Sequence, residues 1–358
     1  VYDGQTFKMA RFEEWLVRNQ IPWPRLPTGR LALGDDTFRQ MAKAYPEVAP
    51  LRELRHSLGT LRRNELQVGD DGRNRCLLSP FRSKTGRNQP SNAKFIFGPS
   101  RWFRGLIKPA PGYGLAYLDF RSQEIAIAAA LSGDEAMMAA YTSGDPYMAF
   151  AIRAGLAPSG ATKQSHKAVR NRCKQIMLGV GYGMGAETLA LRAGIHVAEA
   201  RKLLRSHHET YRTFWGWSEN NVNVALAGGT LQTVYGWPIH LGSGTQPNDR
   251  SLQNFPMQAN GAEMLRLAAC KATEAGLTIC APIHDALLLE APLDQLDEDV
   301  ERLKAIMIDA SRVVMKSLEC RVDVEIVRYP DRYRSEGGGE MWDRVMDLLD
   351  HCIPEAAE

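Results

Sequence analysis

Two aspartates stand at the ends of apolar runs that lie far apart in the chain. Asp119 ends the run 114–119, and Asp285 lies between the two apolar halves of 277–290. The first run predicts a β-strand, and the second predicts a β-hairpin with a carboxylate at its turn. Two carboxylates at strand ends are what a two-metal phosphoryl-transfer site needs. Many proteins carry Asp at strand ends, so the pair gains weight only from the residues between them.

A second segment that could do chemistry spans residues 170–185 and carries Arg170, Lys174, Leu178 and Tyr182 at intervals of four. On a helix this spacing places the four side chains in one slowly drifting stripe. Two cations followed by an apolar and an aromatic side chain could hold a triphosphate at one end and a base at the other. An ordinary helix with exposed cations and a buried Leu and Tyr remains the alternative. Several glycines at the end of the segment favour a hinge or a close ligand, since each costs about 1 kcal/mol inside a helix.

The elements that must position these residues form a sheet interrupted by helices. An antiparallel hairpin and neighbouring strands flank a long, mostly helical stretch, which predicts an α+β fold with a helical insertion. The pattern predicts a mostly helical region over 1–80 and further helices over 122–131, 135–227, 260–275 and 294–317, with strands over 114–120, 230–235 and 320–327.

Composition places few limits on function. The chain has 358 residues, 44% of them hydrophobic and 24% charged, which is typical of a soluble globular protein. A formal net charge of +3 neither requires nor excludes a nucleic-acid partner. Six cysteines without a Cys-x-x-Cys pair argue against structural zinc or disulfides and favour reduced thiols in the cytosol. No apolar run approaches a membrane span and no signal peptide is present, and the start at Val1 is typical of a fragment or processed product.

Together these motifs resemble those of family A DNA polymerases, the bacterial DNA polymerase I type. The family's first motif, an Asp at a strand end with a Glu five residues later, is matched by Asp119 and Glu124. Its second motif, Arg-x3-Lys-x3-(Phe/Tyr)-Gly-x2-Tyr-Gly, is matched over 170–183. Its third motif, His-Asp-Glu on a hairpin, is matched by His284 and Asp285. Weaker matches are Thr85-Gly86-Arg87 and the segment 250–258, and the resemblance covers residues 81–330.

The resemblance implies a right-hand polymerase fold of the α+β class. It implies an antiparallel palm sheet, a helical fingers insertion and a short, helical, thumb-like N-terminal region. The expected boundaries are a thumb-like region over 1–80, the first part of the palm over 81–134, the fingers over 135–238 and the second part of the palm over 239–358.

The resemblance also implies an activity and residue roles. We expect a DNA-directed DNA polymerase that adds deoxynucleotides to a primer 3′-end by two-metal phosphoryl transfer, without proofreading exonuclease in this chain. Two Mg²⁺ ions, replaceable by Mn²⁺, are expected on Asp119, Asp285 and the backbone carbonyl of Phe120. Lys174 is expected to be catalytic, as a proton donor to pyrophosphate. The expected nucleotide-binding residues are Arg170, Lys174, Leu178, Tyr182 and Glu124, and the expected primer- and template-binding residues are Arg87, Arg250, Asn254, Gln258 and His284.

The implied partners are primer–template DNA and dNTPs, in replication or repair, with no membrane. The chain is expected to be a monomer of phage or plasmid origin, working in the cytoplasm of a bacterial cell or a phage-infected host. An exonuclease or helicase–primase domain is expected upstream, outside this chain. Because the N-terminal region is shorter than the usual thumb, low processivity and steep salt dependence are expected.

Three departures from the family pattern carry expectations of their own. Leu178 replaces an aromatic residue, which predicts weaker nucleotide binding or lower fidelity and discrimination against dideoxynucleotides. Ala286 replaces the Glu of the third motif, and Ala126 replaces an Arg usual in the first. The alternatives to a DNA polymerase are a phage-type single-subunit RNA polymerase and a non-catalytic nucleic-acid-binding relic. Glu124 argues against the RNA polymerase, because the family's Glu blocks a 2′-hydroxyl. The presence of both aspartates, Asp119 and Asp285, and of both cations, Arg170 and Lys174, argues against the relic.

Overall fold

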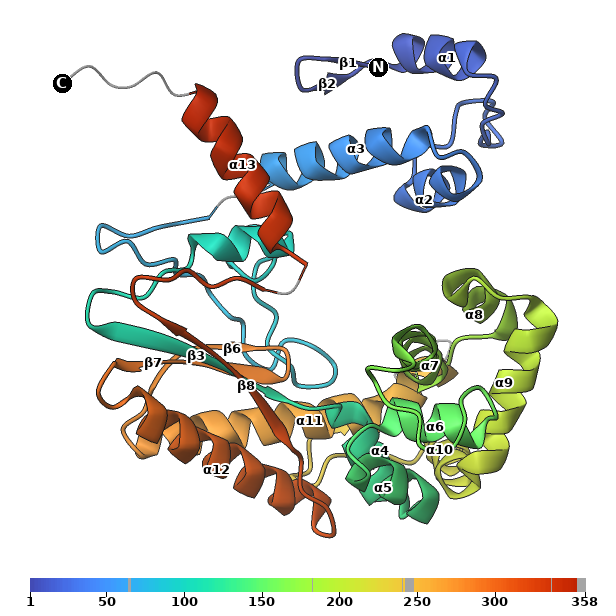
Figure 1. Cartoon of the computed structure of the whole chain (residues 1–358). Helices are drawn as coiled ribbons and strands as arrows, with labels where there is room; N and C mark the ends of the chain where they lie inside the picture. The colour runs from blue at the N-terminus through green and yellow to red at the C-terminus, as the bar shows by residue number, and fades with distance from the viewer. Residues whose placement is uncertain (64–65, 182, 240, 242–247, 336, 353–358) are drawn as a thin grey trace. The chain divides into compact units, whose positions relative to one another are not determined.

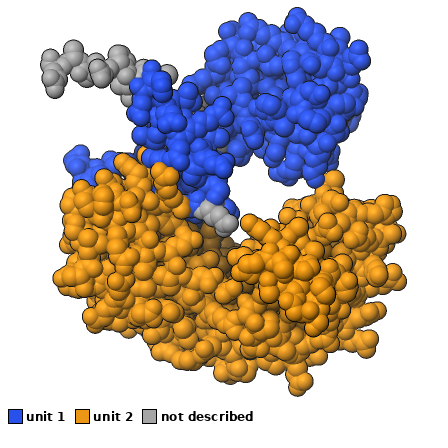
Figure 2. All heavy atoms as spheres, viewed as in Figure 1, with its two compact units in different colours: residues 1–77, 90–104, 335–358 blue, residues 78–89, 105–334 orange. Residues whose placement is uncertain are grey.

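The computed structural model describes the whole chain except residues 64–65, 182, 240, 242–247, 336 and 353–358. The chain forms two compact units, coloured blue and orange in Figure 2. The larger unit comprises Leu78–Gln89 and Gly105–Arg334, and it contains every predicted site residue that the structure describes. The smaller unit comprises Val1–Leu77, Pro90–Arg104 and Ser335–Glu358.

The larger unit is built on a four-stranded antiparallel sheet with the strand order β6-β7-β3-β8. Strand β3 (Tyr113–Phe120) lies between β7 and β8. Its side chains alternate, with Leu118 and Phe120 buried while Tyr117 and Asp119 are half-buried on the opposite face. The alternation therefore directs Asp119 away from the core. The other strands are β6 (Thr278–Ile283), β7 (Ala286–Pro292) and β8 (Val322–Arg328).

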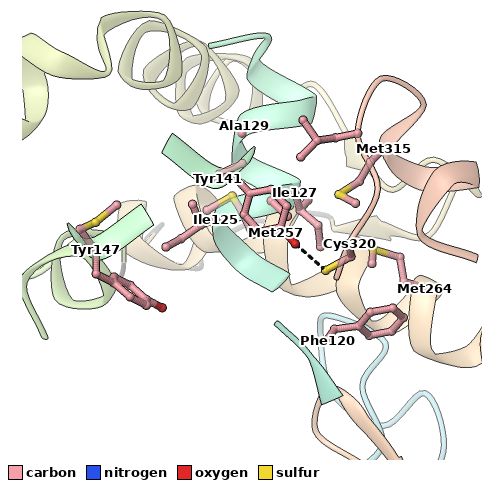
Figure 3. Packing of buried hydrophobic residues seen from close by; sticks show 14 of the residues in the cluster. Phe120, Ile125, Ile127, Ala129, Tyr141, Tyr147, Met257, Met264, Met315 and Cys320 are labelled. Atoms are coloured by element: carbon pink, nitrogen blue, oxygen red, sulfur yellow. Dashed lines mark hydrogen bonds between the residues drawn. The ribbon is translucent and has the colours of Figure 1, made fainter. Parts of the chain in front are cut away.

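Two long helices, α11 (Asp249–Glu274) and α12 (Leu296–Met315), lie side by side and pack against the sheet (Figure 1). Helix α4 (Gln123–Ser132) packs on both of them and is apolar almost all round, as its burial requires. It starts directly after β3, because Ser122 adopts a left-handed backbone (φ 52°) that reverses the chain. Figure 3 shows Phe120 of β3 in the same core as side chains of these helices.

Helix α11 begins earlier than the sequence pattern predicts. The pattern predicts a helix over 260–275, whereas the helix starts at Asp249, where the Asn248 side chain accepts the backbone N–H of Ser251 at 3.3 Å. Pro256 lies inside the helix. A proline removes one helical hydrogen bond and usually ends a helix, which is why the prediction began too late. The predicted primer- and template-binding segment 250–258 therefore lies on a helix.

The insertion between α4 and α11 is helical, as predicted. Two of its helices begin at aspartate caps, since Asp134 accepts the N–H of Met137 at 2.9 Å and Asp145 accepts that of Met148 at 3.2 Å. The insertion contains α5 (Glu135–Thr142), α6 (Pro146–Arg153), α7 (Lys167–Gly181), α8 (Ala186–Ala193), α9 (Val197–Thr210) and α10 (Arg212–Leu226).

The strand predicted over 230–235 is shorter in the structure. Strand β4 (Leu231–Gln232) pairs with β5 (Pro238–Ile239). A turn intervenes, in which the Gly236 N–H donates to the Thr233 carbonyl at 2.9 Å and Gly236 takes a positive φ of 84°. The β-branched residues before the turn suggested a longer strand than the turn permits.

The smaller unit has its own aromatic core. Phe12, Trp23 and Phe38 meet there, with ring centroids of Phe12 and Trp23 4.9 Å apart. The mostly helical prediction for 1–80 missed the initial hairpin, and α13 was not predicted. The elements are β1 (Tyr2–Asp3), β2 (Thr6–Phe7), α1 (Met9–Arg18), α2 (Asp35–Ala44), α3 (Val48–Arg63), the 3₁₀ helix Arg101–Leu106, which runs into the larger unit, and α13 (Gly339–Cys352). None of the described helices is both long and apolar enough to span a membrane.

Candidate active site

The two carboxylates singled out by the sequence come together at one end of the sheet. Asp119, near the end of β3, is in register with Ala286, the first residue of β7. Asp285 immediately precedes β7, and its backbone carbonyl accepts the N–H of Phe120 at 3.1 Å. His284 is exposed, with a left-handed backbone (φ 54°) in the turn between β6 and β7. The hairpin turn therefore places Asp285 beside the end of β3.

The electrostatics of this site disfavour a second negative charge. Burial, followed by the neighbouring Asp285 carboxylate, raises the pKa of Asp119 to about 8. Asp323 and Glu325 of β8 raise this pKa further. Asp323 lies opposite Asp119 in the sheet, and Glu325 lies two residues further along the same face. Neither acid is among the predicted site residues, although the alternation of Val322, Asp323, Val324 and Glu325 is typical of a strand with one acidic face.

The donor set fits a hard divalent cation. Oδ1 of Asp119 is buried and accepts no hydrogen bond from a donor group, which is costly for a carboxylate oxygen unless a proton or a cation is bound. In the described part of the chain, no group of three or more His, Cys, Asp and Glu residues is arranged to hold a metal ion. A cation between Asp119 and Asp285 would therefore take its remaining ligands from backbone, water and substrate. That arrangement suits Mg²⁺, which keeps waters and binds substrate phosphates.

A buried hydrogen-bond network supports the strand ends beside this site. Tyr141 of α5 donates to the Arg121 carbonyl at 3.2 Å and lies 3.4 Å from the Cys320 sulfur, a contact drawn as a dashed line in Figure 3. Its hydroxyl also accepts the backbone N–H of Arg321 at 3.0 Å. Burial raises the pKa of Tyr141, so the phenol stays protonated. Because Arg121 follows β3 and Arg321 precedes β8, the network holds the two strands in register where Asp119 stands.

The cations predicted on α7 lie on one face of that helix. Arg170 forms an ion pair with Asp145, and its guanidinium lies 5.3 Å from the ring centroid of buried Tyr147. The exposed Lys174 places its Nζ 5.9 Å from the same ring. Ser122, at the start of α4, donates to the Tyr147 hydroxyl at 3.4 Å. Tyr147 thus connects α7 to the segment after Asp119.

Glu124, Leu178 and Asn254, three predicted site residues from different helices, line one pocket. The pocket walls are mostly apolar and include three methionines, whose flexible side chains adapt to different contents. The full lining comprises Glu124, Ile125, Ala128, Met137, Met177, Leu178, Gly181, His207, Phe214, Asn254 and Met257.

Buried His207 in this pocket was not predicted. Its Nδ1 accepts the indole N–H of Trp215 at 3.1 Å, which leaves the proton of a neutral imidazole on Nε2. Burial lowers the pKa of His207 to about 3, so the ring is neutral near pH 7. The sequence places His207 next to a second histidine on a helix, and nothing in that pattern separates a pocket residue from an exposed one.

The predicted primer- and template-binding residues occupy two places. Nη2 of Arg87 lies 3.6 Å from Oε1 of Glu124. Asn254 donates to the Arg250 carbonyl at 2.8 Å. The Arg250 side chain lies over Gly183, so a Cβ added to Gly183 would stand 2.7 Å from Cγ of Arg250. Gln258 is half-buried on α11. The predicted base contact at Tyr182 lies outside the described residues.

The sheet with its helical insertion has the fold of a polymerase domain. It superposes on the POL domain of Pol1 from M. smegmatis, solved in complex with DNA primer-template and dNTP, with a TM-score of 0.73. The match covers 90% of this chain and 60% of that chain, at 21% sequence identity. Residues 91–329 match the sequence model of DNA polymerase family A. The chain therefore belongs to DNA polymerase family A, whose members generally use divalent metal ions.

Bacterial and phage polymerases are among the similar proteins. DNA polymerase I of Chloroflexus aurantiacus is 24% identical over 325 residues, which are 84% of this chain and 34% of that protein. The DNA polymerase of Mycobacterium phage D29 is 26% identical over 298 residues, covering 79% of this chain and 47% of the phage protein. The thermostable DNA polymerase I of Thermus aquaticus is 26% identical over 303 residues. The chain thus spans less than half the length of these curated relatives.

Proposed function

We propose that this chain carries the polymerase activity of a DNA-directed DNA polymerase, extending a primer 3′-end with deoxynucleotides. The observation that carries the proposal is the meeting of Asp119 and Asp285 at the sheet end, where a buried carboxylate oxygen lacks a partner. Family membership and the cations of α7 support it. The sheet would serve as the palm, with residues 135–238 as the fingers and 1–80 as a thumb-like region.

Two Mg²⁺ ions are proposed to bind at Asp119, Asp285 and the backbone carbonyl of Phe120. When bound, they would supply charge neutralisation for the triphosphate and lower the pKa of the primer 3′-hydroxyl. Asp323 and Glu325 add negative charge on the same face and would strengthen the attraction for cations. The Tyr141 network would keep the strand ends fixed while substrates exchange.

The incoming nucleotide is proposed to bind along α7. Lys174, exposed and beside Tyr147, would bind the phosphates and donate a proton to pyrophosphate. Arg170 would bind the same phosphates, and its ion pair with Asp145 orients its guanidinium. Leu178 and Glu124 line one pocket, so the base and the sugar 2′ position would lie near it, with Tyr182 on the base.

The primer and template are proposed to contact residues around this pocket. His284 would support the primer terminus, and Arg87 would contact primer and template near the minor groove. The α11 residues Arg250, Asn254 and Gln258 would contact the nascent pair from the minor-groove side, where acceptors are common to all base pairs.

Mg²⁺ binding is expected to release a proton near pH 7. With a pKa of about 8, roughly nine-tenths of Asp119 is protonated at pH 7, and only the carboxylate binds the cation. Apparent Mg²⁺ affinity should therefore rise about tenfold per pH unit up to about pH 8 and then level off. Titration calorimetry in buffers of different ionisation enthalpy measures the released proton at pH 7 and at pH 9. Equal proton release at pH 7 and at pH 9 would contradict the assignment of Asp119 as a metal ligand. Asp294→Asn changes an exposed aspartate beyond β7 and is the matched control.

Leu178→Phe is expected to tighten nucleotide binding. A ring at this position would stack on the incoming base, and such contacts contribute about 0.5–1.5 kcal/mol, or roughly 2- to 10-fold in affinity. Single-nucleotide insertion at varied dNTP concentration gives the apparent Kd. Leu226→Phe, at an exposed leucine ending α10, is the matched control. An unchanged Kd in a folded Leu178→Phe protein would show that residue 178 does not contact the incoming base.

Primer extension with dNTPs and NTPs in parallel tests the proposed function. The wild-type chain should extend a labelled DNA primer with dNTPs and reject NTPs, and Glu124→Ala should accept NTPs more readily because it removes the block to a 2′-hydroxyl. Preferential extension with NTPs by the wild type would instead favour an RNA polymerase. DNA binding without any extension would favour a non-catalytic relic.

A further inference from the structure

Residues 83–87 form a closed turn that leads into Arg87. Within the turn, the Gly86 N–H donates to the Ser83 carbonyl at 2.9 Å, and the Ser83 N–H donates to the Arg87 carbonyl at 3.3 Å. Gly86 has a positive φ of 70°, which favours glycine at this position. The turn leaves the Arg87 guanidinium 3.6 Å from Glu124 on α4.

Two side chains from distant segments hold the backbone of this turn. Trp237, at the end of the β4–β5 turn, donates its indole N–H to the Lys84 carbonyl at 3.0 Å. The same ring packs on Gly86, where an added Cβ would lie 3.4 Å from it. Arg266 of α11 donates to the Gly86 carbonyl at 2.6 Å and pairs with Glu263 at 3.1 Å.

The ring of Phe81 contacts both Arg266 and Trp237. The Arg266 guanidinium lies 3.9 Å from the ring centroid of Phe81, and the Phe81 and Trp237 centroids are 5.4 Å apart. Phe81 takes a positive φ of 60°, a conformation that bulky residues adopt only where surrounding contacts require it. Phe81, Trp237 and Arg266 are called the Arg266 clamp below.

We infer that the Arg266 clamp positions the Arg87–Glu124 pair and thereby contributes to sugar selection and primer binding. Nε of Arg87 is buried without a hydrogen-bond partner, so the guanidinium depends on the turn backbone and on Glu124 for its place. Releasing the turn would let Arg87 move and would weaken the contact by which Arg87 positions Glu124 at the sugar. The inference rests on the proposed function, in which Glu124 excludes a 2′-hydroxyl and Arg87 contacts the primer. Phe81, Trp237 and Arg266 are positioning residues here, because they act through Arg87.

Arg266→Gln in the full chain tests this inference through the ratio of dNTP to NTP insertion at one template position. The ratio is expected to fall about tenfold, the size of one charge-assisted hydrogen bond, and the KM for primer–template should rise. The kcat with the correct dNTP should stay within about twofold, since Asp119 and Asp285 are untouched. Arg266→Lys should recover part of the ratio, because an ammonium can still donate to the Gly86 carbonyl. Trp237→Phe, which removes the neutral indole donor and part of the ring that packs on Gly86, should lower the ratio less than Arg266→Gln.

Arg302→Gln is the matched control, since Arg302 of α12 pairs with Asp299 at 2.7 Å and donates to the carbonyl of Ala275, which ends α11, at 2.8 Å. It should leave both the ratio and the KM unchanged. In a Glu124→Ala background, Arg266→Gln should lower the ratio little further.

Two outcomes would overturn the inference, and they are distinguishable. If Glu124→Ala relaxes sugar selection while Arg266→Gln changes only the melting temperature or lowers kcat equally for all nucleotides, the clamp is merely structural and the proposed function stands. If Glu124→Ala itself leaves sugar selection unchanged, the proposed role of Glu124 fails and the inference fails with it.

Discussion

Asp119→Asn and Asp285→Asn are each expected to lower the rate of primer extension by at least about 10³-fold, because each removes one of the two carboxylates proposed to hold the metal ions. Asparagine keeps the size of the side chain but not its charge. Single-turnover extension with saturating dNTP and Mg²⁺ measures the chemical step directly. Primer–template binding, followed by fluorescence anisotropy, should change little, since neither aspartate is proposed to contact the duplex.

Stability provides a second readout for these variants. Burial, and then the neighbouring Asp285 carboxylate, disfavours the charged form of Asp119 when no cation is bound, as its raised pKa indicates. Asp119→Asn should therefore be at least as heat-stable as the wild type in EDTA, and Mg²⁺ should no longer raise its melting temperature. Asp294→Asn carries the same change at an exposed position and should behave as wild type. A residual extension rate within about tenfold of wild type in either site variant would refute the metal assignment.

Lys174→Met is expected to lower kcat by about 10²- to 10⁴-fold, the range of a lost general acid. The side chain is exposed on α7 beside Tyr147, and methionine keeps most of its length while removing the donor and the charge. Apparent Kd for dNTP should also rise, because one cation no longer faces the triphosphate. Rapid-quench insertion at varied dNTP separates the two effects.

Lys202→Met, at an exposed lysine on α9, controls for the loss of charge. Lys174→Arg should keep much of the nucleotide affinity and lose most of the rate, since guanidinium is a poor proton donor. If Lys174→Met changes only the Kd and leaves kcat intact, the residue binds phosphate without acting as an acid.

Local patterns predicted the parts of the fold that depend on one segment. The strand before Asp119, the buried helix after it and the hairpin around Asp285 follow from apolar runs and turn residues, and the structure confirms them. The start of α11 was predicted wrongly, because Pro256 interrupts the local helical pattern while packing compensates for it. The initial hairpin of the smaller unit has strands too short to leave a periodic pattern.

Contacts between distant segments account for what the sequence did not reveal. Glu124 follows Asp119 closely, so a single motif relates them. By contrast, Asp145 meets Arg170 across two helices, and Asp323 reaches Asp119 only through strand pairing. A single sequence does not show which distant residues lie close together in the fold. An acidic residue on a strand or at a helix cap has the same local pattern whether it lies in a site or elsewhere. The roles of the motif residues remain predictions.

Template-directed DNA synthesis is tested most directly by insertion of single nucleotides opposite each of the four template bases. Each dNTP would be offered alone, with Mg²⁺, to a labelled primer on four otherwise identical templates, beside Asp285→Asn. We expect insertion of the complementary dNTP in each case and its loss in the variant. Insertion that ignores the template base, or that persists in Asp285→Asn, would contradict a templated polymerase built on this carboxylate pair.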